Sequence, residues 1–286
     1  DGIKLFVMII WLASYPKSGS TFLRSLISSY VYSESGNFDF KLLKNIKQFP
    51  TNEFFENLGI DVSNKNQVSK NYINAQIEIN KKSRITFLKT HSSFCKMFNR
   101  YNFTDLQNTL GVIYIVRDPR NVATSFARHN SKSVKDTVDI MTNSLATGNE
   151  ANQVETYLGS WNFNYNSWKV FKSSNIYHLL KYEDLIFNTK NSFKQVLNFI
   201  NNNLKFPISI DDRKVEKVIN ETKFSKMRDL EKKVGFDEAK INDNTGKVVP
   251  FFNQGKKNNW KKNLDVDLSS KIEEAFREEM IELNYL

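Results

Sequence analysis

The chain has 286 residues, 40% of them hydrophobic, which is typical of one large folded domain and excludes a disordered or fibrous chain. Its formal net charge of +10 favours anionic partners, such as a nucleic acid, an anionic lipid, an acidic glycan or a charged nucleotide. The single cysteine, Cys95, excludes an internal disulfide framework and a Cys-rich metal site, and it fits a cytoplasmic location.

The first predicted element is the apolar run from Leu5 to Ala13. It is too short to span a bilayer, which needs ~20 residues, and it lacks the flanks of a signal peptide. We therefore interpret it as a buried strand. The chain begins at Asp1, so the sequence leaves open whether a leader or anchor has been removed.

The later elements alternate between strands and helices. The patterns predict a helix through Phe22 to Tyr30, short helices and loops over about 34–80, and strands at 85–89, 112–116 and 176–180. Further helices are predicted to begin at Pro119 and to run over 152–171 and about 193–200. A C-terminal helix is predicted from Ser270, with Ser270 and Glu273 as a capping box. This alternation predicts an α/β fold with a central parallel sheet flanked by helices. Without a repeat or a Pro/Gly-rich linker, we expect a single domain over 1–286.

The loop after the first strand has the composition of an anion site. It reads Tyr-Pro-Lys-Ser-Gly-Ser-Thr-Phe over 15–22, and Gly19 permits a tight turn before a helix with free N–H groups. The side-chain donors are Lys17, Ser18, Ser20 and Thr21. Together they predict a cradle for a phosphate or phosphosulfate. The loop is not a Walker A motif, because the lysine precedes the glycine. For this motif alone, an ordinary capped turn is the alternative.

This loop resembles the 5'-phosphosulfate loop of sulfotransferases that use 3'-phosphoadenosine 5'-phosphosulfate (PAPS), whose usual form is Tyr-Pro-Lys-Ser-Gly-Thr-Thr-Trp. Ser20 and Phe22 are the two departures. The resemblance implies that Lys17 contacts the bridging oxygen of the leaving group and that Phe22 stacks on the adenine. It also implies the sulfotransferase fold, which is similar to that of P-loop nucleotide kinases.

A second segment, Val-Arg-Asp-Pro-Arg-Asn-Val-Ala-Thr-Ser over 116–125, resembles the 3'-phosphate segment of the same family. Arg117 leaves a strand end and Ser125 lies two turns into the next helix, so both can reach a phosphate above that edge. By itself, Arg-Asp-Pro-Arg is more often a surface turn with local salt bridges. The correct order of the two segments favours the functional interpretation.

The third match is Lys89-Thr-His91, which resembles the Lys-Thr-His of the family, where the histidine is the general base. An acceptor hydroxyl must lose a proton as it attacks sulfur, and a histidine suits that task. We assign His91 this role and expect Lys89 to stabilise charge on the transferring group. His129 and His178 are interpreted as structural residues.

Three further segments resemble family sequences near the nucleotide, although core packing or turn formation would explain each of them alone. They are Tyr-Glu-Asp at 182–184, Thr-Lys-Phe with a later methionine at 222–227, and Phe-Phe-Asn-Gln-Gly followed by Trp-Lys at 251–261. The resemblance therefore runs from about residue 9 to about 262. It implies these additional nucleotide-binding residues: Tyr182, Thr222, Phe224, Phe252, Asn253, Gln254, Gly255 and Lys256.

Some positions depart from the family pattern. Asn253 and Gln254 replace an Arg-Lys pair that contacts the 3'-phosphate, and we hypothesise that Lys256 and Lys257 turn in to replace it. Asn164 stands where many members have a histidine beside the acceptor, so the acceptor class is not inferred. The dimer motif of animal cytosolic members is not reproduced at 261–266, which leaves the oligomeric state open.

The resulting prediction is in-line sulfuryl transfer from PAPS to a hydroxyl or amine, without a metal. The acceptor is a small molecule, a glycan or a peptide.

A P-loop kinase or NTPase is the first alternative, but the sequence lacks Gly-Lys-Ser/Thr and a strand-terminal Asp for Mg²⁺. A nucleic-acid-binding protein is the second, suggested only by the net charge, and we expect neither a nucleic-acid partner nor a membrane span.

Overall fold

A five-stranded parallel sheet forms the centre of the molecule. The computed structural model describes residues 8–82, 85–148, 154–242, 245–253, 255 and 258–286. The strand order is β2-β3-β1-β6-β9, and every neighbouring pair is parallel. The strands are β1 (Met8–Ser14), β2 (Lys47–Gln48), β3 (Ile85–Thr90), β6 (Thr109–Val116) and β9 (Tyr177–Lys181). The predicted α/β fold with a central parallel sheet is confirmed.

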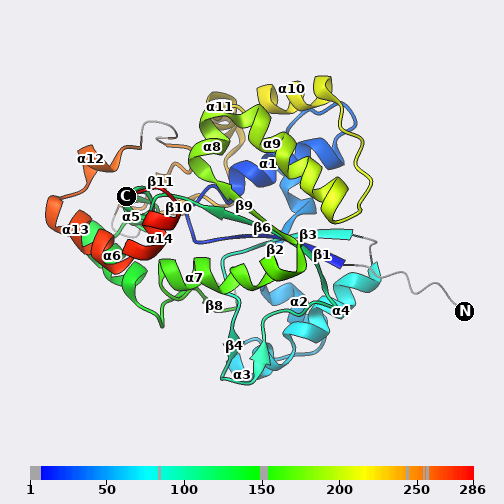
Figure 1. Ribbon diagram of the computed structural model, residues 1–286, viewed down its shortest axis with the longest axis horizontal. Helices are drawn as coiled ribbons and strands as arrows, with labels where there is room; N and C mark the ends of the chain where they lie inside the picture. Colours follow the sequence, from blue (N-terminus) through cyan, green and yellow to red (C-terminus); the bar gives the residue numbers. More distant parts are fainter. Residues whose placement is uncertain (1–7, 83–84, 149–153, 243–244, 254, 256–257) are drawn as a thin grey trace, which may run out of the picture.

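Helices cover both faces of this sheet. They are α1 (Ser20–Tyr32), α2 (Asn52–Glu56), α3 (Lys65–Lys70), α4 (Tyr72–Lys82), α5 (Pro119–His129), α6 (Val134–Thr142), α7 (Trp161–Trp168), α8 (Tyr182–Phe187), α9 (Thr189–Asn198), α10 (Asp212–Glu221), α11 (Phe224–Val234), α12 (Trp260–Asn263), α13 (Val266–Ala275) and α14 (Arg277–Glu282). In Figure 1, α1, α9 and α10 lie on one side of the strands and α7 lies on the other. Two short 3₁₀ helices, a π-helical turn and three two-stranded ribbons complete the described chain: η1 (Phe40–Asn45), η2 (Lys169–Ser174), η3 (Phe199–Asn203), β4 (Lys96–Met97) with β5 (Tyr101–Asn102), β7 (Thr147–Gly148) with β8 (Thr156–Tyr157), and β10 (Lys240–Ile241) with β11 (Val248–Val249).

Strand β1 explains why this part of the sequence is continuously apolar. Residues Ile9 to Ala13 are completely buried, because successive side chains point to opposite faces and both faces are covered. Ile9, Trp11 and Ala13 enter one hydrophobic core, whereas Ile10 and Leu12 enter the other. The predicted run began at Leu5; residues 5–7 lie outside the described part of the chain.

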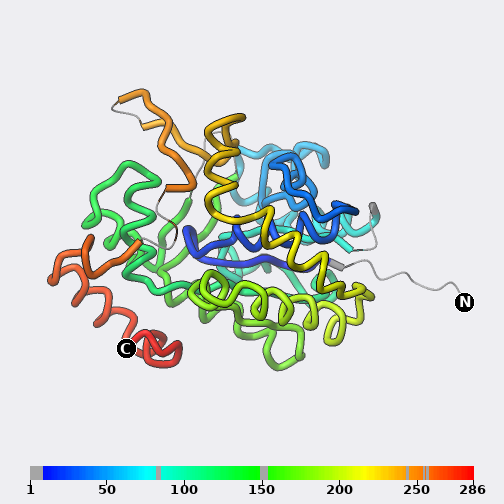
Figure 2. Tube along the Cα trace, turned by 90° about the horizontal axis from the view of Figure 1, so that it is seen from above, coloured from blue at the N-terminus to red at the C-terminus, as the bar shows by residue number. Residues whose placement is uncertain are grey.

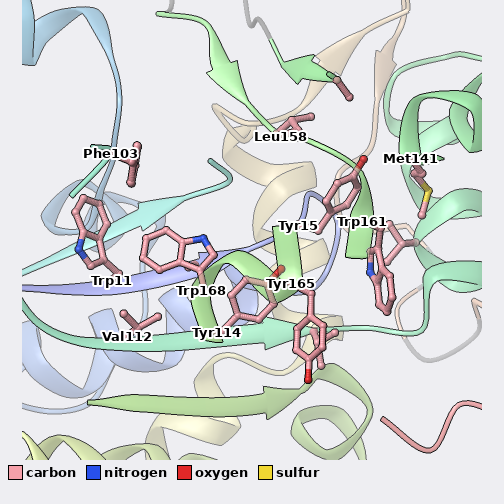
Figure 3. Close-up of a cluster of buried hydrophobic side chains, with 14 of the residues drawn as sticks. Trp11, Tyr15, Phe103, Val112, Tyr114, Met141, Leu158, Trp161, Tyr165 and Trp168 are labelled. Carbon is pink, nitrogen blue, oxygen red and sulfur yellow. The ribbon is translucent and has the colours of Figure 1, made fainter. Parts of the chain in front are cut away.

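Aromatic side chains fill the core between the sheet and α7. Trp11 of β1 and Trp168 of α7 lie side by side in Figure 3, with ring centroids 6.1 Å apart. Trp11 Nε1 donates to Thr109 Oγ1 at 3.1 Å, and Trp168 Nε1 donates to the Ser92 carbonyl at 3.0 Å. The second bond attaches the loop after β3 to α7 and so helps to position the histidine that precedes Ser92.

Two predicted elements are wrong in detail, and one strand was not predicted. The helix expected over 152–171 begins only at Trp161, because Thr156 and Tyr157 form a strand and Gly159 has a φ of +65° that ends any helical run. The C-terminal helix begins at Val266 with Asp265 as N-cap, so Ser270 and Glu273 are not a capping box. The edge strand β2 was missed inside the polar stretch over 34–80.

Candidate functional site

The polar segments singled out in the sequence meet at one edge of the sheet. Strands β3, β1, β6 and β9 are adjacent and parallel, so their carboxyl ends lie together. His91 follows β3, the loop over 15–19 follows β1, Arg117 follows β6 and Tyr182 follows β9. A cavity of about 1030 Å³ opens over this edge.

Most of the predicted site residues line this cavity. These are Lys17, Gly19, Ser20, Thr21, Phe22, Lys89, His91, Arg117, Ser125, Tyr182, Phe224, Phe252, Asn253 and Gly255. Ser18 and Thr222 do not line it: both side chains are completely buried, and the Thr222 hydroxyl donates to the Val218 carbonyl at 2.8 Å. Gln254, Lys256 and Lys257 lie outside the described residues, so the hypothesis about the two lysines stays a prediction.

The turn after β1 requires glycine at position 19. Gly19 has a φ of +104°, in the region that favours glycine, and it is the N-cap of α1. A Cβ atom placed there would lie 2.4 Å from Tyr182 Cδ2. The aromatic ring from the end of β9 therefore packs directly on the loop backbone, which explains how two segments far apart in the sequence make one wall of the site.

Arg117 connects the same two segments. Its Nη1 donates to the Lys17 carbonyl at 2.9 Å, and its guanidinium lies 4.3 Å from the centroid of the Tyr182 ring. The side chain is only 6% exposed, and its Nε has no hydrogen-bond partner among the described residues. The buried Ser18 hydroxyl likewise has none. A buried donor without a partner usually indicates a missing acceptor. Of these two residues, Arg117 lines the cavity, so its unpartnered Nε fits an anion at this place, whereas Ser18 does not line it.

Arg120, the second arginine of the same segment, makes structural contacts instead. Arg120 forms ion pairs with Asp118 and Glu273 at 2.9 and 2.6 Å, donates to the Tyr285 carbonyl, and stacks on Trp260. It is buried in these contacts and does not line the cavity. Of the Arg-Asp-Pro-Arg motif, only Arg117 faces the cavity.

His91 is held in one orientation. Its Nδ1 lies 2.8 Å from the Ser14 carbonyl, which can only accept, so Nδ1 carries the proton and Nε2 keeps its lone pair. Asn164 Nδ2 donates to the His91 carbonyl and to the Leu158 carbonyl, both at 2.9 Å, while Asn164 Oδ1 accepts from Tyr114. Burial, together with the Lys89 charge, lowers the pKa of His91 to about 3. The ring is therefore neutral at physiological pH.

Lys17 is an unusual lysine. Its backbone has a φ of +62°, and its Nζ lies 3.9 Å from the centroid of the Phe251 ring. Burial lowers the pKa of Lys17 to about 7; Glu238 opposes the shift, and Lys89 and Arg117 add to it. An anion that enters the cavity would stabilise the charged ammonium and so raise the pKa of Lys17 again.

A carboxylate that the motifs did not indicate lies in the same place. Glu238 Oε2 accepts from Thr21 Oγ1 at 3.0 Å and from Lys89 Nζ at 3.3 Å, and Glu238 Oε1 pairs with the Arg24 guanidinium. Its own burial would raise the pKa of Glu238, but Lys89 and Arg24 outweigh it and lower that pKa to about 2. The surrounding polar loop carries no pattern that could have marked this residue.

His129, interpreted from the sequence as a structural residue, also lines the cavity. Its ring makes an edge contact with Phe251, with centroids 5.6 Å apart, and burial lowers its pKa to about 3. The aromatic cluster of Phe40, Phe236, Phe251 and Phe252 closes this side of the cavity. Glu231 of α11 anchors it by accepting from the N–H groups of Phe251 and Phe252.

The cavity has a strongly cationic lining. Seven lysines and arginines line its described part, whereas only two carboxylates do. The cations are Lys17, Lys89, Arg117, Arg128, Lys132, Lys223 and Lys240, and the carboxylates are Asp237 and Glu238.

Within the described residues, no three His, Cys, Asp or Glu side chains gather in a group that could hold a metal ion. No helix of the described chain is long and apolar enough to cross a membrane.

Comparison with known proteins gives one family match. A family model described as "Sulfotransferase domain" matches residues 9–284. A structure of mouse sulfotransferase SULT7A1 complexed with PAP superposes with a TM-score of 0.54 and 17% identity, covering 96% of this chain and 84% of that one. Retinol dehydratase with androsterone and the inactive cofactor PAP gives a TM-score of 0.58 and 14% identity, covering 95% and 80%; its complex with retinol and PAP gives 0.58 and 15%, covering 95% and 81%.

Proposed function

Because this chain belongs to the sulfotransferase family, we propose that it transfers a sulfuryl group from PAPS to an acceptor hydroxyl or amine. The observation that carries this proposal is the convergence of Lys17, Arg117 and His91 at one cationic sheet edge. Arg117 Nε, which has no hydrogen-bond partner among the described residues, can donate to an anionic cosubstrate in this cavity. PAP, the desulfated product, is present in the similar sulfotransferase and retinol dehydratase structures.

The proposal includes one orientation of the donor. The turn over 17–21 and the N-terminus of α1 hold the 5'-phosphosulfate, and Arg117 and Ser125 hold the 3'-phosphate. Phe22 and Phe224, both partly exposed and both lining the cavity, stack on the adenine. The roles of Thr222, Gln254 and Lys256 stay predictions.

His91 acts as the general base in this proposal. The acceptor oxygen attacks sulfur in line, its proton passes to His91 Nε2, and the bond between sulfur and the 5'-phosphate oxygen breaks. Lys17 neutralises the charge that develops on that phosphate oxygen, and Lys89 stabilises the transferring group. The neutral ring with its proton on Nδ1 supports this assignment, because the lone pair on Nε2 is then free to accept.

The acceptor is proposed to be a small molecule with an apolar body. The cavity is also lined by Phe126, Ile140, Val154, Leu158 and Ile241, which offer an apolar surface. Retinol and androsterone, which occupy the retinol dehydratase complexes, are molecules of this class. A glycan acceptor, with hydroxyl groups on most of its carbons, would match these apolar side chains poorly. The expected cytoplasmic location and the absence of a nucleic-acid partner remain predictions.

Two assays test the proposal. PAP should raise the melting temperature of the protein, whereas ATP with Mg²⁺ should not; the reverse result would indicate a kinase. Incubation with ³⁵S-labelled PAPS and a panel of apolar alcohols and phenols, oligosaccharides and tyrosyl peptides should then label the first group. Labelling confined to oligosaccharides or peptides would contradict the assigned acceptor class.

A further inference from the structure

Glu238 lies inside the proposed donor site. It belongs to the segment between α11 and β10, and its side chain is 27% exposed. One carboxylate oxygen accepts from Thr21 and Lys89, and the other pairs with Arg24. The segment that carries it arrives from Gly235, with a φ of +77°, and continues into the β10–β11 hairpin, which projects from the body of the molecule in Figure 2.

These contacts belong to an anion position. Thr21 lies in the first turn of α1, a 13-residue helix whose N-terminus favours negative charge. Thr21 belongs to the turn proposed to hold the 5'-phosphate that PAP and PAPS share, and Lys89 is proposed to stabilise the sulfuryl group next to it. A carboxylate and a phosphosulfate both present oxygen acceptors to such donors. Glu238 therefore makes, within the chain, contacts that the cosubstrate needs.

We propose that Glu238 is an internal anion that competes with the donor for Thr21 and Lys89 and must leave when PAPS binds. This inference rests on the proposed function. Arg24 remains in place when Glu238 leaves, because its Nη2 also donates to the Leu43 carbonyl at 2.6 Å. Its guanidinium then faces the bound anion. Donor binding therefore replaces the Glu238 carboxylate with the donor as the counter-ion of Arg24 and Lys89.

The substitution Glu238→Gln tests this competition. The amide keeps an oxygen acceptor for Arg24 and the size of the side chain, but it removes the charge. We expect isothermal titration calorimetry to show that the variant binds PAP about 10-fold more tightly than the wild type, because a charge-assisted contact is replaced by a neutral one. Glu238→Asp keeps the charge but shortens the reach, and it should also bind PAP more tightly.

Asp229→Asn is the matched control. It removes one negative charge from an exposed side chain on α11 that does not line the cavity and makes none of these three contacts. We expect its PAP affinity to stay within about twofold of the wild type, since exposed charges are screened. An equal gain in affinity in Asp229→Asn and Glu238→Gln would show that the effect comes from net charge alone and would overturn the competition.

Two failures are distinguishable. If the wild type binds PAP and both Glu238 variants bind it equally or more weakly, then Glu238 does not compete and the inference is wrong, while the proposed function stands. If neither the wild type nor any variant binds PAP, the proposed function itself fails and the inference fails with it.

Discussion

The base proposed for this enzyme is already neutral and oriented in the free protein. Burial and Lys89 place the pKa of His91 at about 3, and the Ser14 carbonyl fixes the proton on Nδ1. We therefore expect kcat/KM to show no acid limb from this group above about pH 5, because a base is lost only as the pH falls through its own pKa. A limb near pH 6.5 that disappears in His91→Ala would contradict this account.

Replacing the ring tests its role directly. His91→Ala should lower kcat by about 10²-fold or more, since general-base catalysis contributes at least that much. The Kd for PAP should change less than threefold, because the ring is not assigned to the donor. Single-turnover kinetics measure the rate of sulfuryl transfer, and titration with PAP measures its Kd. Near-normal turnover would remove His91 from the mechanism.

Lys17 links donor binding to pH. Its pKa of about 7 means that the amine is mostly neutral at pH 8 in the free protein, and a bound anion favours the ammonium. PAP binding at pH 8 should thus take up close to one proton, measurable by calorimetry in buffers of different ionisation enthalpy. Lys17→Arg keeps the charge at all pH values and should abolish the uptake. Unchanged uptake in that variant would assign the proton to another group.

At the scale of elements, α11 holds the aromatic side of the cavity in place. Glu231 accepts from the N–H groups of Phe251 and Phe252 at 2.6 and 3.0 Å, and the residue is buried. Glu231→Ala leaves two donors unsatisfied, which should cost about 2 kcal/mol of unfolding free energy. It should also weaken PAP binding. The two hydrogen bonds hold the start of the segment that carries Phe252, Asn253 and Gly255, and these three residues line the cavity.

The control for that variant lies on the same helix. Asp229 is exposed and makes neither of these two hydrogen bonds, so Asp229→Ala should change neither the urea midpoint nor PAP affinity appreciably. Equal losses in Glu231→Ala and Asp229→Ala would show that the helix, rather than the two hydrogen bonds, determines the effect.

The elements that the sequence predicted well are those with a strong local pattern. Strand β1 is apolar throughout because both faces are covered, and Pro119 opens α5 after Asp118, whose side chain caps it. Val154 and Leu158 have helical spacing, yet Gly159 and the pairing of Thr156 and Tyr157 with β7 override it. Residues 152 and 153 of the predicted helix lie outside the described part of the chain. Edge strand β2 has only two residues, and its pairing with β3 depends on the tertiary fold.

In the candidate site, too, residues with a local sequence pattern could be predicted, and residues placed by the tertiary fold could not. Motif residues such as Lys17 and Arg117 could be predicted, because each follows an apolar strand and the carboxyl ends of parallel strands meet. Glu238 and His129 could not, because their positions depend on how the segments around them fold back over the cavity. No local spacing encodes that path.

At the scale of the whole molecule, Glu238 contributes to stability as well as to the proposed competition. Its pKa is lowered from an ordinary 4.5 to about 2, so its contribution is complete above pH 4.5 and is lost as the pH falls through about 2. Urea unfolding should show the wild type more stable than Glu238→Gln at pH 6, with a smaller difference at pH 3. A difference that grows toward pH 3 would contradict the assigned ion pairs.

A crystal structure with PAP bound tests the central claim most directly. The account predicts the 5'-phosphate at the turn around Gly19, the 3'-phosphate within hydrogen-bonding distance of Arg117 and Ser125, and the adenine between Phe22 and Phe224. PAP bound elsewhere, or its absence from this sheet edge at saturating concentration, would contradict the assignment of the donor site.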